Sequence, residues 1–115
     1  MSRIRPWEVW YVDLGEPVGH EQGGSRPGVV VGSALHCRFP IQMAIFVPLT
    51  TTDRGLTHHV PVFSPDSGLA KPSFAMTEQP RTLSTDRLED DLPLGMLVEA
   101  ERREITFWLK KMVAA

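Results

Sequence analysis

The side chains best suited to chemistry in this sequence lie in one glycine-rich stretch, residues 19–27, which reads GHEQGGSRP. His20 is of the residue type that exchanges protons near neutral pH. The guanidinium of Arg26 is always charged and can donate two parallel hydrogen bonds to a phosphate. Glu21 and Gln22 are expected to order the loop by hydrogen bonding. The stretch predicts a phosphate-handling site, with a plain loop-capping arginine and an inert surface histidine as the alternatives.

Two further polar segments follow apolar runs. Thr50, Thr51 and Thr52 come at the end of the run 42–49, where a strand presents side chains to a ligand. The three hydroxyls could equally satisfy only local backbone groups. Glu78 and Arg81 flank Gln79 and Pro80, and form either a surface ion pair worth under about 1 kcal/mol or one wall of a groove that faces the loop arginine.

The spacing of the potential ligands and the absence of known motifs argue against a metal site and a nucleotide site. The chain has four histidines and one cysteine. His58 and His59 are adjacent in a predicted strand, so they are expected to point to opposite faces and not to share an ion. His36 and Cys37 lack a further pair at ligand spacing. Since no phosphate-cradling glycine motif or serine hydrolase motif occurs either, we expect no metal and no cofactor.

The sequence predicts a series of short strands followed by one helix, and these elements must position the polar residues. Strands are predicted at residues 8–14, 28–33, 42–49, 58–63, 72–77 and 81–83, with residues 33–40 as an irregular connection. Pro61 favours an edge position for its strand. This pattern is typical of a small barrel or sandwich.

In the C-terminal part, the spacing of the apolar residues changes from that of a strand to that of a helix. Apolar residues recur at helical spacing, although Glu101 interrupts the stripe: Leu94, Leu97, Val98, Ile105, Trp108, Leu109 and Met112. Asp90 and Asp91 before Pro93 suit the first turn of a helix. We therefore expect a single, mainly β domain over residues 1–115 with a C-terminal helix.

The composition of the chain limits the binding partners and the cellular compartment that can be expected. The formal net charge is −2, so binding to a nucleic acid would need a local basic patch. A single cysteine excludes an intramolecular disulfide and fits a reducing cytoplasm. No apolar run approaches the roughly 20 residues needed to span a bilayer, so a cytoplasmic protein with no membrane contact is expected.

Four segments give the chain its resemblance to the MazF/PemK (Kid) family of toxins from bacterial toxin–antitoxin pairs. They are residues 8–14 (EVWYVDL), 19–27, 47–50 (VPLT) and 78–82 (EQPRT). The resemblance implies a small SH3-like barrel of the MazF/PemK/CcdB type with a C-terminal helix, assembled as a homodimer. It also implies a metal-independent endoribonuclease of the mRNA interferase type. In such enzymes the 2'-hydroxyl of single-stranded RNA attacks the adjacent phosphorus, leaving a cyclic phosphate and a 5'-hydroxyl. Antitoxins of the family lay an acidic, largely disordered tail in the same groove.

The resemblance also implies roles for individual residues. The MazF branch points to Arg26 and Thr50 as catalytic residues. The PemK branch points to His20 and Glu78, although this chain has Met76 where that branch has an arginine and Glu78 where it has an aspartate. The expected RNA-binding set is Glu21, Gln22, Thr51, Arg54, Gln79 and Arg81.

Two other functions stay open. The first is a protein-binding toxin like the CcdB gyrase poisons, which rely on a tryptophan near the C-terminal end, whereas Trp108 here falls on the apolar stripe. The second is a degenerate member that binds RNA or antitoxin without cleaving, which the departure at Met76 suggests.

Overall fold

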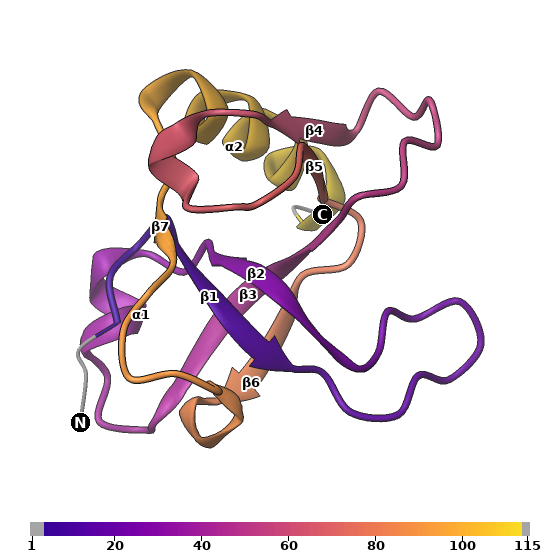
Figure 1. Ribbon diagram of the computed structural model, residues 1–115. Coiled ribbons are helices and arrows are strands. Elements are labelled where there is room, and N and C mark those ends of the chain that lie inside the picture. Colours follow the sequence, from indigo (N-terminus) through magenta and orange to yellow (C-terminus); the bar gives the residue numbers. More distant parts are fainter. Residues whose placement is uncertain (1–3, 114–115) are drawn as a thin grey trace.

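A curved antiparallel sheet and a C-terminal helix make up the computed structural model, which describes residues 4–113 (Figure 1). The elements in chain order are β1 (Glu8–Asp13), β2 (Ser25–Val30), α1 (Ala34–Arg38), β3 (Met43–Thr50), β4 (His59–Val62), the 3-10 turn η1 (Pro65–Ser67), β5 (Ser73–Met76), β6 (Arg81–Ser84), the 3-10 turn η2 (Thr85–Arg87), β7 (Gly95–Met96) and α2 (Glu99–Val113).

The long strand β3 joins the two halves of the sheet. The strand order is β4-β5-β3-β2-β1-β7, and β6 also pairs with β3. Along one edge of β3, Met43–Phe46 pair with β6, and Leu49 and Thr50 pair with β5. The other edge pairs with β2, with Gly28 opposite Pro48. The turn between β5 and β6 therefore connects two strands that pair with the same edge of β3.

Apolar side chains fill both sides of the sheet, which explains the continuous apolar runs of β2 and β3. Successive strand residues point to opposite faces, so Val9 and Trp10 enter different clusters. Val9 packs in a cluster that also contains Ile105 of α2. Trp10 packs with Phe46 in the second cluster. Helix α2 thus covers the half of the sheet built around β4 and β5 (Figure 1).

The expected fold class is confirmed: the protein is mainly β, a half-barrel sheet with a C-terminal helix. All six predicted strands occur, and β4 with Pro61 is an edge strand as expected. Among residues 4–113, no helix combines the length and the apolar character needed to cross a lipid bilayer.

Strand β2 and the connection that follows it differ from the prediction. Strand β2 begins at Ser25, because residues 25–29 pair with β1, so Arg26 belongs to a strand. The connection 33–40 contains α1, whose start is capped by the Ser33 hydroxyl. This helix has five residues and no buried residue, so it leaves no periodic apolar signal.

The C-terminal helix starts later than its apolar stripe suggests. Gly95 and Met96 form β7 and pair with β1, so the chain is extended where the stripe predicts helix. A Cβ at Gly95 would lie 2.2 Å from the Asp66 carbonyl oxygen, so glycine permits the close contact with η1. The helix begins at Glu99, six residues after Pro93.

Glu101, which interrupts the apolar stripe, anchors α2 to the loop after β4. Its carboxylate accepts hydrogen bonds from the backbone N–H groups of Phe63 (3.0 Å) and Ser64 (3.1 Å), from the Ser64 hydroxyl (2.8 Å) and from the Val98 N–H at the helix start (3.3 Å). We expect Glu101→Ala to lower the free energy of unfolding by about 2 kcal/mol, since partly buried donors lose a charged acceptor. Urea unfolding tests this, with the exposed Glu104→Ala on the same helix as control. Equal stability of the two variants would contradict it.

Candidate functional site

The β1–β2 loop is held in shape by its own backbone. Leu14 N–H donates to the Gly24 carbonyl (2.9 Å) and Gly24 N–H donates to the Gly15 carbonyl (2.8 Å). Gly24 has a φ of 70°, a left-handed conformation that favours glycine. At the base of the loop, the Arg26 Nε–H donates to the Gly23 carbonyl at 3.2 Å. Backbone hydrogen bonds and the left-handed conformation of Gly24 therefore shape the base of the loop that extends beyond β1 and β2 (Figure 1).

The turn between β5 and β6 meets this loop, although the two segments lie far apart in the sequence. Gln22 N–H donates to the Gln79 side-chain oxygen at 3.1 Å. From the start of β6, Arg81 Nη1 donates to the carbonyls of Leu14 (3.3 Å) and Gln22 (3.4 Å). Among the described residues Arg81 forms no ion pair with Glu78. The simple surface pair is therefore wrong, and Arg81 joins the two segments.

Two adjoining cavities open between loop and turn. The first has a volume of about 400 Å³ and is lined by Gly19, His20, Glu21, Gln22, Arg54, Leu56, His59, Met76, Glu78 and Gln79. The second has a volume of about 470 Å³ and is lined by His20, Glu21, Glu78, Gln79, Pro80 and Arg81. The fold thus brings together seven of the ten expected site residues: His20, Glu21, Gln22, Arg54, Glu78, Gln79 and Arg81.

The other three expected residues lie outside these cavity walls. Thr50 ends β3, is buried, and accepts a hydrogen bond from Thr52 N–H at 3.2 Å. Thr51 is exposed. Strands β2 and β3 pair in a register that sets Gly28 opposite Pro48. The pairing ends at Gly28 and Pro48; the same register continued by two residues would set Arg26 opposite Thr50, with both side chains on one face.

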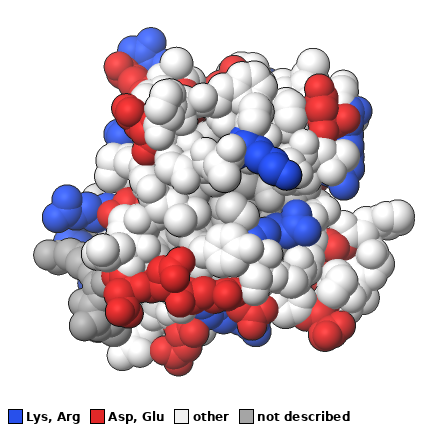
Figure 2. Space-filling model, viewed as in Figure 1, with Lys and Arg blue, Asp and Glu red and all other residues white. Residues whose placement is uncertain are grey.

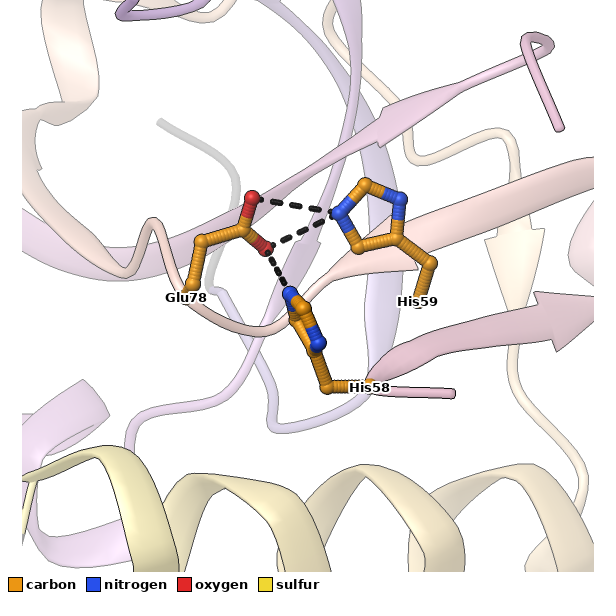
Figure 3. A group of neighbouring side chains, drawn as sticks. All are labelled: His58, His59 and Glu78. Atoms are coloured by element: carbon orange, nitrogen blue, oxygen red, sulfur yellow. Dashed lines mark hydrogen bonds and ion pairs between the residues drawn. The ribbon is translucent and has the colours of Figure 1, made fainter. Parts of the chain in front are cut away.

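Glu78 lies beside two imidazoles, that of His59, which lines the first cavity with it, and that of His58 (Figure 3). His59 Nε2 lies 3.1 Å from each Glu78 carboxylate oxygen, and His58 Nε2 lies 3.4 Å from Oε1. The two rings stand edge to face, with centroids 4.9 Å apart. The expectation that these histidines point to opposite faces is wrong, because β4 begins only at His59 and His58 lies in the preceding turn.

The environment of Glu78 favours its ionised form. Partial burial acts to raise the pKa of its carboxyl group, but the hydrogen bond from His59 and a backbone hydrogen bond, with the nearby His59 charge, outweigh burial. The pKa of Glu78 therefore lies below its ordinary value, and the group is a carboxylate at neutral pH. It can accept a proton or ligate a cation.

The cluster of His58, His59 and Glu78 could have been predicted by pairing two strands of the sequence. The alternation of side chains along one strand does not reveal it. Strands β4 and β5 pair with His59 opposite Met76. In a hairpin with that register, residues just before β4 lie beside residues just after β5, which are Thr77 and Glu78. Pairing the two predicted strands would have placed both histidines near Glu78.

Charge is unevenly spread over the surface. The segment between β6 and β7 bears four exposed carboxylates: Asp86, Glu89, Asp90 and Asp91. Figure 2 shows acidic side chains gathered over this region, and a few Lys or Arg side chains elsewhere on the same face. The candidate cavities contain both signs of charge, with Arg54 and Arg81 beside the carboxylates.

A larger hollow, of about 1000 Å³, lies along α2. It is lined by Trp7 and by helix residues between Glu99 and Lys111. Its lining residues include no histidine, and its carboxylate, Glu99, is paired with Arg103 at 3.0 Å. The smaller cavities are therefore the better candidates for proton-transfer chemistry despite their size.

Comparison with known proteins identifies related sequences and folds. The model of a family described as "PemK-like, MazF-like toxin of type II toxin-antitoxin system" matches residues 5–113. Endoribonuclease EndoA from Bacillus subtilis (strain 168) is 30% identical over 90 residues, 77% of this chain and 78% of that protein.

Solved structures share the fold. MazF (Form-I) from Deinococcus radiodurans superposes with a TM-score of 0.85 at 17% identity, covering 100% of both chains. An endoribonuclease from Mycobacterial species, solved in complex with its cognate antitoxin, superposes with a TM-score of 0.77 at 24% identity, covering 96% of this chain and 94% of that one.

Proposed function

Because the chain belongs to the PemK-like, MazF-like toxin family of type II toxin–antitoxin systems, we propose that it is a sequence-selective endoribonuclease that cleaves single-stranded RNA without a metal ion. The observation that carries this proposal is the convergence of the β1–β2 loop and the β5–β6 turn on adjoining cavities. There a carboxylate, a histidine and arginines lie together.

The proposed reaction needs a base, an acid and a cation. The ribose 2'-oxygen forms a bond to the adjacent phosphorus while the bond from phosphorus to the 5'-oxygen breaks. The base takes the 2'-hydroxyl proton, the acid protonates the leaving 5'-oxygen, and the cation stabilises charge on the non-bridging oxygens. The products are a 2',3'-cyclic phosphate and a 5'-hydroxyl.

We assign the base to Glu78 and the acid to His20. Both line the same two cavities, and the lowered pKa of Glu78 keeps it unprotonated at neutral pH. His20 is exposed on the opposing loop and can supply a proton from across the cavity. Met76, buried beneath, lines the first cavity where the PemK branch has a cation, so charge stabilisation falls to other residues.

Arg26 is the proposed phosphate-binding cation. Among its contacts with described residues, only Nε–H is engaged, with the Gly23 carbonyl, which leaves the two terminal nitrogens to donate to phosphate oxygens. Thr50, opposite Arg26 in the continued strand register, would orient the same phosphate through its hydroxyl. Glu21, Gln22, Thr51, Arg54, Gln79 and Arg81 are proposed to contact the flanking nucleotides.

We also propose a cognate antitoxin and a homodimer. The mycobacterial endoribonuclease of the same fold was solved with its cognate antitoxin, and an acidic antitoxin tail would find Arg54 and Arg81 beside the cavities. Exposed apolar residues such as Phe107, 53% exposed, would suit a subunit contact. Light scattering of the purified protein measures the subunit number directly.

RNA cleavage itself is the direct test. We expect the purified protein, with EDTA present, to cut a long defined single-stranded RNA at a repeated short sequence, with ends mapped by primer extension. Cuts that require an added divalent ion would contradict metal independence. Intact RNA with folded protein would contradict the ribonuclease, and inhibition of gyrase supercoiling would then favour a CcdB-like toxin.

A further inference from the structure

We propose that His58, His59 and Glu78 form a binding site for one divalent ion of the Zn²⁺ class. The three side chains come from two segments 19 residues apart and each offers one ligand atom, all within 4.8 Å of one another. Two imidazoles and one carboxylate, with a further position open, are a donor set found at zinc sites in enzymes.

The distances fit such an ion with little movement. Bonds of about 2.0–2.1 Å in a tetrahedral arrangement set ligand atoms about 3.3 Å apart. His59 Nε2 lies 3.1 Å from both carboxylate oxygens of Glu78, and His58 Nε2 lies 3.4 Å from Oε1 (Figure 3). The two ligand pairs that include Glu78 therefore already have the separation expected around one ion, and the ligand atoms of the two histidines lie within 4.8 Å of each other. Binding would replace hydrogen bonds by metal–ligand bonds.

The surrounding fold holds the two histidines in place. The buried Thr77 hydroxyl donates to the His58 carbonyl at 2.6 Å, which ties the turn bearing His58 to the residue before Glu78. The His58 ring also packs edge-on against Trp108 of α2, with centroids 6.2 Å apart. His59 is 4% exposed and fixed as the first residue of β4. A site whose ligands are already positioned loses little entropy on binding.

Two features set the expected affinity. His59 and Glu78 line the first cavity, so water or an anion entering that cavity can complete the coordination of the ion. Metal binding through Nε2 requires the proton of His59 to sit on Nδ1, and this buried nitrogen has no hydrogen-bond partner among the described residues. Since metal-bound histidines usually donate that proton to an acceptor, we expect micromolar rather than nanomolar binding.

The ion would compete with the proposed nuclease chemistry. A carboxylate bound to Zn²⁺ is not free to accept the 2'-hydroxyl proton, so the metal-bound state would be inactive. That consequence rests on the proposed function, whereas binding of the ion does not, and it can be measured without RNA.

Zinc titration of the folded, EDTA-stripped and dialysed protein tests the site. We expect calorimetry to show one Zn²⁺ per chain at micromolar Kd, no saturable binding of Mg²⁺, which prefers oxygen ligands, and visible absorption typical of tetrahedral Co²⁺ when that ion is added. His58→Gln and Glu78→Gln should each weaken Zn²⁺ binding at least about tenfold.

His36→Gln is the matched control, because it removes another partly buried histidine, on α1 and outside this cluster. It should bind Zn²⁺ as the wild type does. Absence of saturable Zn²⁺ binding by the folded wild type would overturn the proposal. So would His58→Gln and Glu78→Gln binding as tightly as wild type, or His36→Gln losing as much. Thermal unfolding confirms that each variant is folded, and the Co²⁺ spectrum of the wild type tests coordination without any substitution.

Discussion

Arg26→Ala is expected to lower kcat for RNA cleavage about 10²- to 10³-fold, the usual effect of removing one donor that stabilises transition-state charge. Strand pairing with Val12 places the backbone of Arg26 at the start of β2, and the Arg26 Nε–H donates to the Gly23 carbonyl. This hydrogen bond restrains the planar guanidinium, so we expect its terminal nitrogens to lose little further side-chain entropy on binding a phosphate. A fluorescent single-stranded RNA reporter in EDTA measures the rate.

Two further variants separate charge from structure. Arg26→Lys keeps the charge but loses the forked geometry, so it should recover only part of the rate. Arg38→Ala removes an exposed arginine from α1 and should cleave as wild type does. The loss of the Gly23 hydrogen bond should cost Arg26→Ala about 1 kcal/mol of stability, which urea unfolding reports separately. Wild-type kcat in Arg26→Ala would remove Arg26 from the mechanism.

The sheet was predictable from the sequence because burial of a strand on one or both faces produces a recognisable pattern of apolar residues within that strand. The run MAIFVPLT in β3 is apolar because β3 lies at the centre of the sheet, and β4 carries Pro61 because it lies at an edge. Elements that lack such a local apolar pattern could not be predicted. Helix α1 buries no side chain, and β7 is extended because Gly95 and Met96 pair with Val9 and Glu8 of β1, which lie far away in the sequence.

The candidate site was predictable in part for a similar reason. The residues carried over from the family, such as His20 and Glu78, do meet at one pair of cavities. What the pattern of a single strand cannot show is the approach of residues across a hairpin. His58 and Glu78 meet because the β4–β5 register, together with the Thr77 bond to the His58 carbonyl, brings two turns together. Side-chain chemistry at strand ends therefore depends on pairing more than on spacing.

Glu78→Gln distinguishes a proton-accepting Glu78 from one that only positions His59. Glutamine keeps a side-chain oxygen that can accept the hydrogen bond from His59 Nε2, now 3.1 Å from each carboxylate oxygen. It cannot serve as a base. If Glu78 takes the 2'-hydroxyl proton, Glu78→Gln should lose about 10²- to 10⁴-fold in kcat, as much as Glu78→Ala, with KM changed little. A positioning role alone would leave Glu78→Gln close to wild type and Glu78→Ala impaired.

The assay must isolate proton transfer from the proposed ion and from folding. EDTA keeps any bound metal out of the comparison, and Glu78→Asp, which restores a carboxylate on a shorter side chain, should recover part of the rate. Glu16→Gln neutralises an exposed carboxylate in the β1–β2 loop outside the cavity linings and should leave kcat unchanged. A Glu78→Gln enzyme with near-wild-type kcat would contradict the base assignment. The proton would then have to go to another group at the cavity, of which His59 is the nearest to Glu78.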